Sequence, residues 1–272
     1  MTISAKVLAH SSHQDCPDLI TLQVRYPRFI HAEAKTHRVI RIDGAEYEFL
    51  QEISFMDDPN LSRNASSSRA TPIKRMIEDV VNDPAMPVAW GSQKAGMQAG
   101  DDIEDIGKAM EIWLQARDAA VEFATDAMNL GLHKQVVNRI LEPFGHISVV
   151  VTATEWDNFF ALRCHPAADP TMLALANAMR DAIAQSTATP LRLGEWHKPY
   201  GGTLLHSAAR CARVSYLNHD GTDPDTAKDD ALADTLMEMG HWSPFEHQAM
   251  PTPGYRHANL SGWMSQRTAL GA

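Results

Sequence analysis

The chain has 272 residues, of which 44% are hydrophobic and 21% are charged, proportions typical of a globular protein. It carries 24 Lys and Arg against 34 Asp and Glu, and the resulting net charge of -10 argues against a general binder of nucleic acid polymers. Its three cysteines form no C-x-x-C pair, its opening lacks the apolar region of a signal peptide, and no long apolar run occurs. We therefore expect a cytoplasmic protein with no membrane span.

The first predicted elements are a strand and a helix. Residues 19–26 alternate, placing Leu22, Val24 and Tyr26 on one face, which predicts a half-buried strand and hence a sheet. Pro27 ends this strand and begins a helix over residues 29–38, in which Glu33 and His37 share a face. Residues 44–68 read as a long loop.

Two further helices follow. Thr71 and Pro72 are expected to be the cap and first residue of a helix that ends near residue 82. The clearest helical pattern covers residues 101–130, with a capping box formed by Asp101 and Glu104. Gly131 suits its termination, and we expect this helix to lie in the core or at a subunit interface.

The second half of the chain alternates between strand and helix signals. Residues 146–154 predict a buried strand that passes into a short helix over residues 155–163. Helical patterns cover residues 171–185 and 225–240, the latter ending at Gly240 in a left-handed cap. Residues 190–202 contain several Gly and Pro and are the expected linker.

The Ser-rich segment SRNASSSRA, residues 62–70, precedes a predicted helix N-terminus. Its hydroxyls, backbone amides and Arg69 suit a phosphate, because unpaired N–H groups and the helix dipole favour an anion. A solvated turn is the alternative reading of the same residues.

Other polar residues allow more than one interpretation. His241, Glu246 and His247 in HWSPFEH suit either a metal cluster or a turn whose polar groups bind a cofactor or the protein itself. Arg163 follows the apolar run FFAL and needs a partner unless its charge reaches solvent, and Arg139 poses the same choice. Cys164, beside Arg163, is either a thiolate nucleophile or a small buried hydrophobe.

Taken together, six segments resemble the flavin-dependent thymidylate synthases, the ThyX family. The family carries A-R-V-S, H-x-[ST]-P-F-E-H, R-H-R-x-x-S-x-N-E-x-S-x-R, R-x-x-L-P and N-F-L-x-L-R. This chain has ARVSY at 212–216, GHWSPFEH at 240–247, THR at 36–38, SRNASSSR at 62–69, NRILEP at 138–143 and DNFFALR at 157–163. The segments that open family members lie at the C-terminal end here, which indicates a circular permutation.

The resemblance implies a role for each matching residue. Flavin contacts are implied for His37, Arg38, Asn158, Ser215, His241 and Ser243. Nucleotide contacts are implied for Glu33, Ser67, Ser68, Arg69, Arg139 and Arg163. Of these, the three residues of the Ser-rich segment lie where the family binds the nucleotide phosphate. Arg163 falls where an arginine polarises the pyrimidine ring, and we take Arg163 and His37 as the candidate catalytic residues.

The chain departs from the family pattern around the substrate. Thr36 replaces the first arginine of R-H-R, a long insertion follows Arg38, and Ala65 replaces the glutamate of the N-E pair. After Arg163, the family's A-Q-x-E-I becomes ADPTM. These changes leave the base and the product open.

By resemblance, the function is one-carbon transfer to C5 of a pyrimidine deoxynucleotide monophosphate, with FAD as cofactor and methylenetetrahydrofolate and NADPH as co-substrates. Conversion of dUMP to dTMP is the family default. The alternatives within the family are a dUMP or dCMP hydroxymethylase and a dCMP methylase. From other classes, a non-catalytic flavin- and nucleotide-binding protein and a metal-dependent hydrolase stay open.

The resemblance also implies the fold and assembly. We expect one α/β (α+β) domain over residues 1–272, with a mixed sheet flanked by helices. Its parts are a core at 1–189, the linker at 190–202, a segment equivalent to the family's N-terminal part at 203–247, and a tail at 248–272 that offers Gln266 and Arg267 for missing contacts. A homotetramer with active sites shared between subunits is expected.

Overall fold

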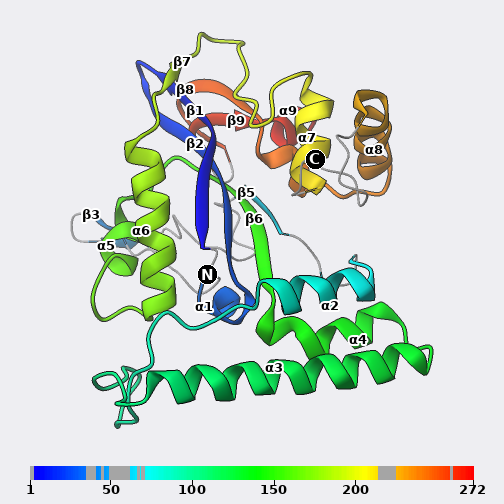
Figure 1. Cartoon of the computed structure of the whole chain (residues 1–272). Helices are drawn as coiled ribbons and strands as arrows, with labels where there is room; N and C mark the ends of the chain where they lie inside the picture. The colour runs from blue at the N-terminus through cyan, green and yellow to red at the C-terminus, as the bar shows by residue number, and fades with distance from the viewer. Residues whose placement is uncertain are drawn as a thin grey trace.

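The computed structural model describes residues 3–34, 41–43, 46–48, 62–65, 68, 71–213, 225–257 and 260–272. Its centre is a five-stranded sheet in the order β5-β6-β2-β1-β7 (Figure 1). These strands are β1 (Ser4–His13), β2 (Cys16–Pro27), β5 (Ser62–Ala65), β6 (His146–Ala153) and β7 (Thr189–Pro190). All neighbours pair antiparallel except β1 and β7, which are parallel. The sheet is mixed and flanked by helices, as predicted.

Both faces of the central strands are covered. Ile147, Val149 and Val151 of β6 pack in one apolar cluster with α6 (Pro170–Ala184), and α5 (Asp157–Arg163) packs beside α6. On the opposite face Val150 packs against Cys211 of α7 (Leu204–Arg213). The alternation predicted for residues 19–26 is confirmed for Leu22, Val24 and Tyr26, each fully buried. Thr21, on the other face of this alternation, is also fully buried, because that face is covered at this end of the strand.

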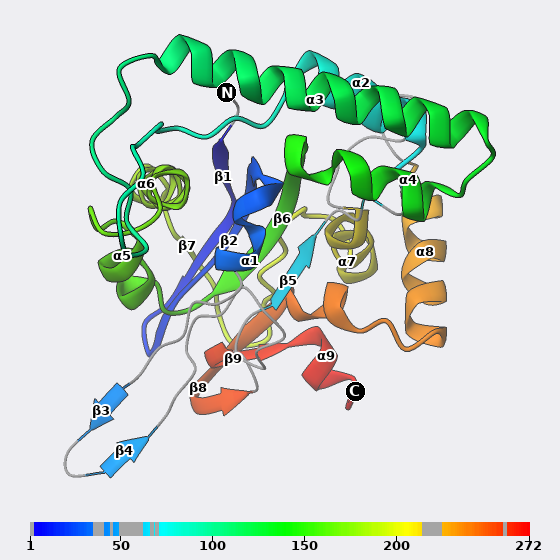
Figure 2. The ribbon, with the colours of Figure 1, turned by 90° about the horizontal axis from the view of Figure 1, so that it is seen from below.

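Three helices form a second apolar cluster below the sheet. They are α2 (Ile73–Asn82), α3 (Ile106–Asn129) and α4 (Lys134–Leu141), followed by the 3-10 turn η2 (Glu142–Phe144). Helix α3 runs along the outside of this layer and buries one stripe against α2 and α4 (Figures 1 and 2). It begins at Ile106, capped by Asp105, so the capping box expected at Asp101 and Glu104 is wrong. Its end before Gly131, whose φ is 81°, is as predicted.

The region after β2 also differs from expectation. The helix expected over residues 29–38 is a 3-10 turn η1 (Arg28–Ile30) followed by α1 (His31–Ala34), with residues 35–38 outside the described part. The expected loop at 44–68 contains β4 (Glu46–Glu48), which pairs with β3 (Arg41–Asp43), and also contains β5. The cap of α2 is Pro72, without a side-chain hydrogen bond, in place of Thr71.

The C-terminal part packs back onto the sheet. Its elements are α7, α8 (Thr226–Glu238), η3 (Ser243–Glu246), β8 (Ala249–His257), β9 (Leu260–Ser265) and α9 (Gln266–Ala269). Gly240 has a φ of 71°, as its predicted capping role requires. Trp263 of β9 is fully buried with Leu19 of β2, and its indole donates to the Pro17 carbonyl at 2.7 Å. No helix in the described ranges is long and apolar enough to cross a bilayer.

Candidate functional site

Motif segments from opposite ends of the chain meet at the β5 edge of the sheet. β5 carries the start of the Ser-rich segment and pairs with β6. The SPFE turn η3 and helix α7, more than 130 residues further along the chain, both contact β5 (Figure 2). The folded chain thus gathers segments that the sequence separates.

Seven of the predicted site residues lie in the described part of the chain. They are Glu33, Ser68, Arg139, Asn158, Arg163, His241 and Ser243. The remaining candidates lie outside it, namely His37, Arg38, Ser67, Arg69 and Ser215.

Arg163 and Glu33 form the first group of candidates. Arg163 is the last residue of α5 and is half-buried, and its buried Nε has no hydrogen-bond partner among the described residues. Partial burial of the Glu33 carboxyl raises its pKa, nearby Asp169 raises it further, and Arg163 opposes both effects. Among the described residues, a guanidinium with an unsatisfied donor therefore lies within electrostatic range of the Glu33 carboxyl group.

Glu142 is the centre of the second group. The Ser68 hydroxyl donates to Glu142 Oε1 at 2.5 Å, and Arg139 Nη1 lies 3.3 Å from each carboxylate oxygen. Arg28 Nη2 lies 3.4 Å from the same Oε1. Burial lowers the pKa of Arg28, while Glu142 opposes that effect by stabilising its charge. Ser68 was predicted to contact the nucleotide phosphate and Arg139 to contact the nucleotide, whereas Arg28 and Glu142 were not foreseen.

Asn138 fixes the backbone beside this group. It is almost fully buried on α4, and its Nδ2 donates to the carbonyls of Ser68 and Thr71 at 2.6 and 2.9 Å. The end of the Ser-rich segment is therefore held by a side chain adjacent to Arg139.

One short helical segment connects the two groups. Arg28 begins η1 and reaches Glu142, whereas Glu33 lies in α1 and faces the charge of Arg163. Arg28 and Glu33 are five residues apart, which corresponds to roughly 8 Å along a helix axis. In both ribbon views α1 lies between α5 and α4 (Figures 1 and 2).

The HWSPFEH turn exposes some polar residues and anchors others. His241 and Ser243 are exposed, while Pro244 and Phe245 are buried beneath them. Glu246 forms an ion pair with Arg267, so the C-terminal tail braces this turn.

His247 belongs to a buried polar chain that crosses the sheet. Its Nδ1 lies 2.8 Å from Thr152 Oγ1, which lies 2.7 Å from Thr21 Oγ1. Thr21 in turn contacts His197 Nε2 at 2.7 Å, and His197 Nδ1 contacts Ser11 Oγ at 2.8 Å. These hydroxyls and imidazoles join the turn to β6, β2 and β1. The expected linker at 190–202 therefore contributes a fully enclosed histidine to the sheet.

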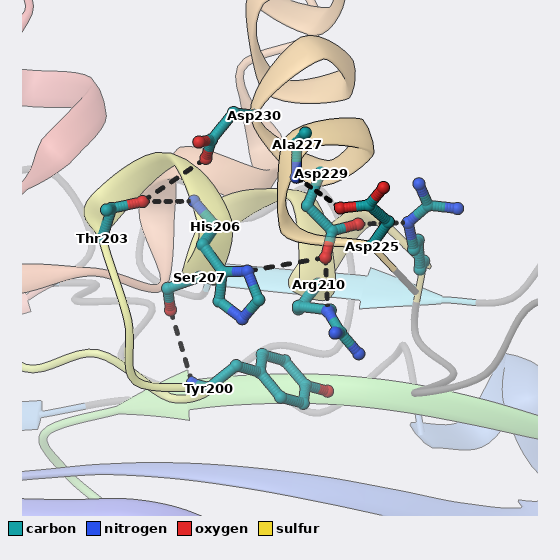
Figure 3. Close-up of polar contacts among 10 residues, drawn as sticks. Tyr200, Thr203, His206, Ser207, Arg210, Asp225, Ala227, Asp229 and Asp230 are labelled. Atoms are coloured by element: carbon teal, nitrogen blue, oxygen red, sulfur yellow. Dashed lines mark hydrogen bonds and ion pairs between the residues drawn. The ribbon is translucent and has the colours of Figure 1, made fainter. Parts of the chain in front are cut away.

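A further ionic cluster, not foreseen from the sequence, fixes α7 against α8 (Figure 3). The fully buried carboxylate of Asp229 accepts from Arg210 Nε at 2.6 Å and from Arg213 Nε at 2.8 Å, with His206 Nδ1 at 3.5 Å. The spacing of His206, Arg210 and Arg213 on one helical face was the available signal. This cluster orients the end of the helix that leads into the ARVSY segment.

Neither the thiolate nor the metal interpretation gains support. Burial raises the pKa of Cys164, which disfavours the thiolate, and it raises the pKa of Cys211 strongly. Across the described ranges, no group of three His, Cys, Asp or Glu side chains is arranged to hold a metal ion.

Comparison with known proteins gives a structural similarity only. No protein-family model and no curated protein sequence matches the chain. The chain is similar to the UMP/dUMP methylase PolB from Streptomyces cacaoi bound with 5-Br dUMP, with a TM-score of 0.49 and 14% identity over 68% of this chain and 90% of that chain. For the complex with 5-Br UMP the TM-score is 0.46, with 14% identity over 68% and 89% of the two chains. At this level of similarity, the assignment of function depends on the residues of the chain itself.

Proposed function

We propose that the protein transfers a one-carbon unit to C5 of a pyrimidine deoxynucleotide monophosphate, with dUMP as the first candidate substrate. The methylene donor is methylenetetrahydrofolate, FAD is the cofactor and NADPH is the reductant. The observation that carries the proposal is the segment 28–34, which joins a cluster of phosphate-type donors at Arg28, Ser68 and Arg139 to Glu33 and Arg163. The six sequence segments shared with the ThyX family support the same chemistry.

In this proposal Arg163 acts on the base. Carbon C5 of a pyrimidine is a weak nucleophile, and it attacks a one-carbon unit more readily when the ring is polarised so that negative charge develops on its carbonyl oxygen. A fixed guanidinium stabilises that charge, and one such preorganised donor is worth roughly 3 kcal/mol. The buried Nε of Arg163, which has no hydrogen-bond partner in the described part of the chain, is the donor that a ring oxygen would satisfy.

The flavin site is proposed on Asn158, His241 and Ser243, together with His37, Arg38 and Ser215. The donor set fits a flavin, because an exposed imidazole and hydroxyl are presented by a turn that Pro244 and Phe245 anchor in the interior. When bound, FAD supplies hydride chemistry that side chains lack. We also propose a homotetramer with shared sites.

The test is an assay of the purified protein with FAD, NADPH, methylenetetrahydrofolate and either dUMP or dCMP labelled with tritium at C5. Tritium release establishes attack at C5, and mass spectrometry of the product separates methyl from hydroxymethyl and uracil from cytosine. A protein that only binds flavin and nucleotide would bind both and release no tritium.

Substitution of Arg163 tests the assigned role. We expect Arg163→Ala to lower tritium release at least 10²-fold while flavin absorbance is retained. The matched control is Arg180→Ala, which removes an exposed arginine from α6. Normal turnover by Arg163→Ala would show that the role is wrongly assigned.

A further inference from the structure

The carboxylate of Glu142 occupies a position that suits an oxygen of a phosphate. Three donors from separate segments approach its Oε1: the Ser68 hydroxyl, Arg139 Nη1 and Arg28 Nη2. Arginine forks and a serine hydroxyl are the groups that proteins use to bind phosphate oxygens. The cluster contains two guanidinium groups and one carboxylate, so its net charge is positive.

The cluster is partly exposed to solvent. The Ser68 residue is 4% exposed, and the side chains of Arg28 and Glu142 are 17% and 20% exposed. The Arg139 side chain is 59% exposed. An anion from solution would therefore meet Arg139 first and then reach the inner donors.

We propose that Glu142 is an internal counterion that competes with the phosphate of the nucleotide for Ser68, Arg28 and Arg139. This inference rests on the proposed function and concerns the selection of its substrate. A phosphate monoester has the charge and the acceptor oxygens to displace the carboxylate. A neutral nucleoside has neither, so Glu142 stays on its donors and the nucleoside gains nothing from them.

A purely structural role explains the arrangement less well. The contact between Arg139 and Glu142 is an i,i+3 pair with an exposed arginine, and such pairs contribute little to stability. Asn138 holds the backbone at Ser68 and Thr71 without using Glu142. The loop therefore keeps its anchor when the charge of Glu142 is removed.

The deciding variant is Glu142→Gln, which keeps the size and one acceptor oxygen but removes the charge. By calorimetry we expect the Kd values for dUMP and for inorganic phosphate to fall about tenfold, since a like charge leaves the anion's surroundings. The Kd for deoxyuridine is expected to stay the same. The matched control is Glu111→Gln, which removes the same charge from an exposed residue paired with Lys108 on α3 and should alter neither.

The outcomes separate this inference from the proposed function. If the wild-type protein binds dUMP and Glu142→Gln binds it equally or more weakly, Glu142 is a structural or positioning group and this inference is overturned. If phosphate binding tightens but dUMP never binds, the inference holds and the proposed substrate is wrong. Should Glu142→Gln fail to fold, Glu142→Asp withdraws the carboxylate by one methylene, and a lower Kd for phosphate is again required.

Discussion

His197 shows how burial controls a single titratable residue in this protein. Its ring is enclosed, and both nitrogens contact hydroxyl groups, those of Thr21 and Ser11. Loss of solvation, together with a smaller effect of nearby His10, lowers its pKa to about 3. His146, which contacts Asp83 at the start of β6, is shifted in the same direction, to about 4. Both imidazoles are therefore neutral near pH 7.

These shifts predict a loss of stability in mild acid. The folded pKa of His197 lies below the ordinary value of 6.5, so the unfolded chain binds the proton first as pH falls. The contribution to stability is complete above pH 6.5 and is lost as pH falls toward 3. Between pH 6.5 and 4 we expect His197 alone to lower the free energy of unfolding by about 3 kcal/mol. Urea unfolding across this range, with His197→Asn as the comparison, measures it, and an equal pH dependence in both proteins would contradict the prediction.

At the scale of elements, the sequence predicted the strands and helices in which apolar residues recur at a regular spacing. Apolar residues recur at the spacing that one buried face imposes in strands β2 and β6 and in helices α2, α6 and α8. Strand β8 was not predicted, because it holds two prolines and a glycine and depends on pairing with β9. The start of α3 was missed because Asp101 and Asp105 both suit an N-cap, and tertiary structure selects between them.

The start of α3 gives a prediction at this scale. The Asp105 carboxylate accepts the backbone N–H of Lys108 at 2.7 Å, which satisfies one of the free donors of the first turn. We expect Asp105→Ala to lower the free energy of unfolding by about 1 kcal/mol. Asp101→Ala, the matched control at the residue favoured by the sequence, should stay within about 0.5 kcal/mol of wild type. Chemical denaturation measures the free energy of unfolding of both variants. A larger loss for Asp101→Ala than for Asp105→Ala would support the longer helix that the sequence predicted.

At the scale of the whole molecule, the candidate site is built from segments that only the folded chain brings together. Ser68 and Arg139 were predicted to serve the same ligand, and in the structure both contact Glu142. Arg28 was not predicted, because an arginine at the end of a strand carries no motif and gains meaning only from the α4 region packed beside it. Glu142 was missed for the same reason. Resemblance to a family identifies residues by their motif. A residue such as Glu142, which pairs with those residues, is identified only from the tertiary packing.

The exposed side of helix α3 is relevant to how the whole molecule assembles. Ile112 and Phe123 are 57% and 63% exposed, and Leu130, at the C-terminal cap, is 82% exposed. Residues 11 and 18 positions apart return to nearly the same angle on a helix, so these side chains form one exposed apolar stripe along α3, beside the face that packs against α2 and α4. Such a stripe on an outer helix suits contact with a second copy, in line with the proposed homotetramer.

We therefore expect the wild-type protein to sediment as an oligomer and Phe123→Glu to shift it toward smaller species. Glutamate keeps the helix propensity of the position while placing a charge within the apolar stripe, where it would lose solvation on association. Leu193→Glu is the matched control, since Leu193 is 67% exposed but lies outside α3. Sedimentation equilibrium at several concentrations measures the shift. A monomeric wild type, or equal dissociation by both variants, would rule out α3 as the subunit contact and leave shared active sites without a structural basis.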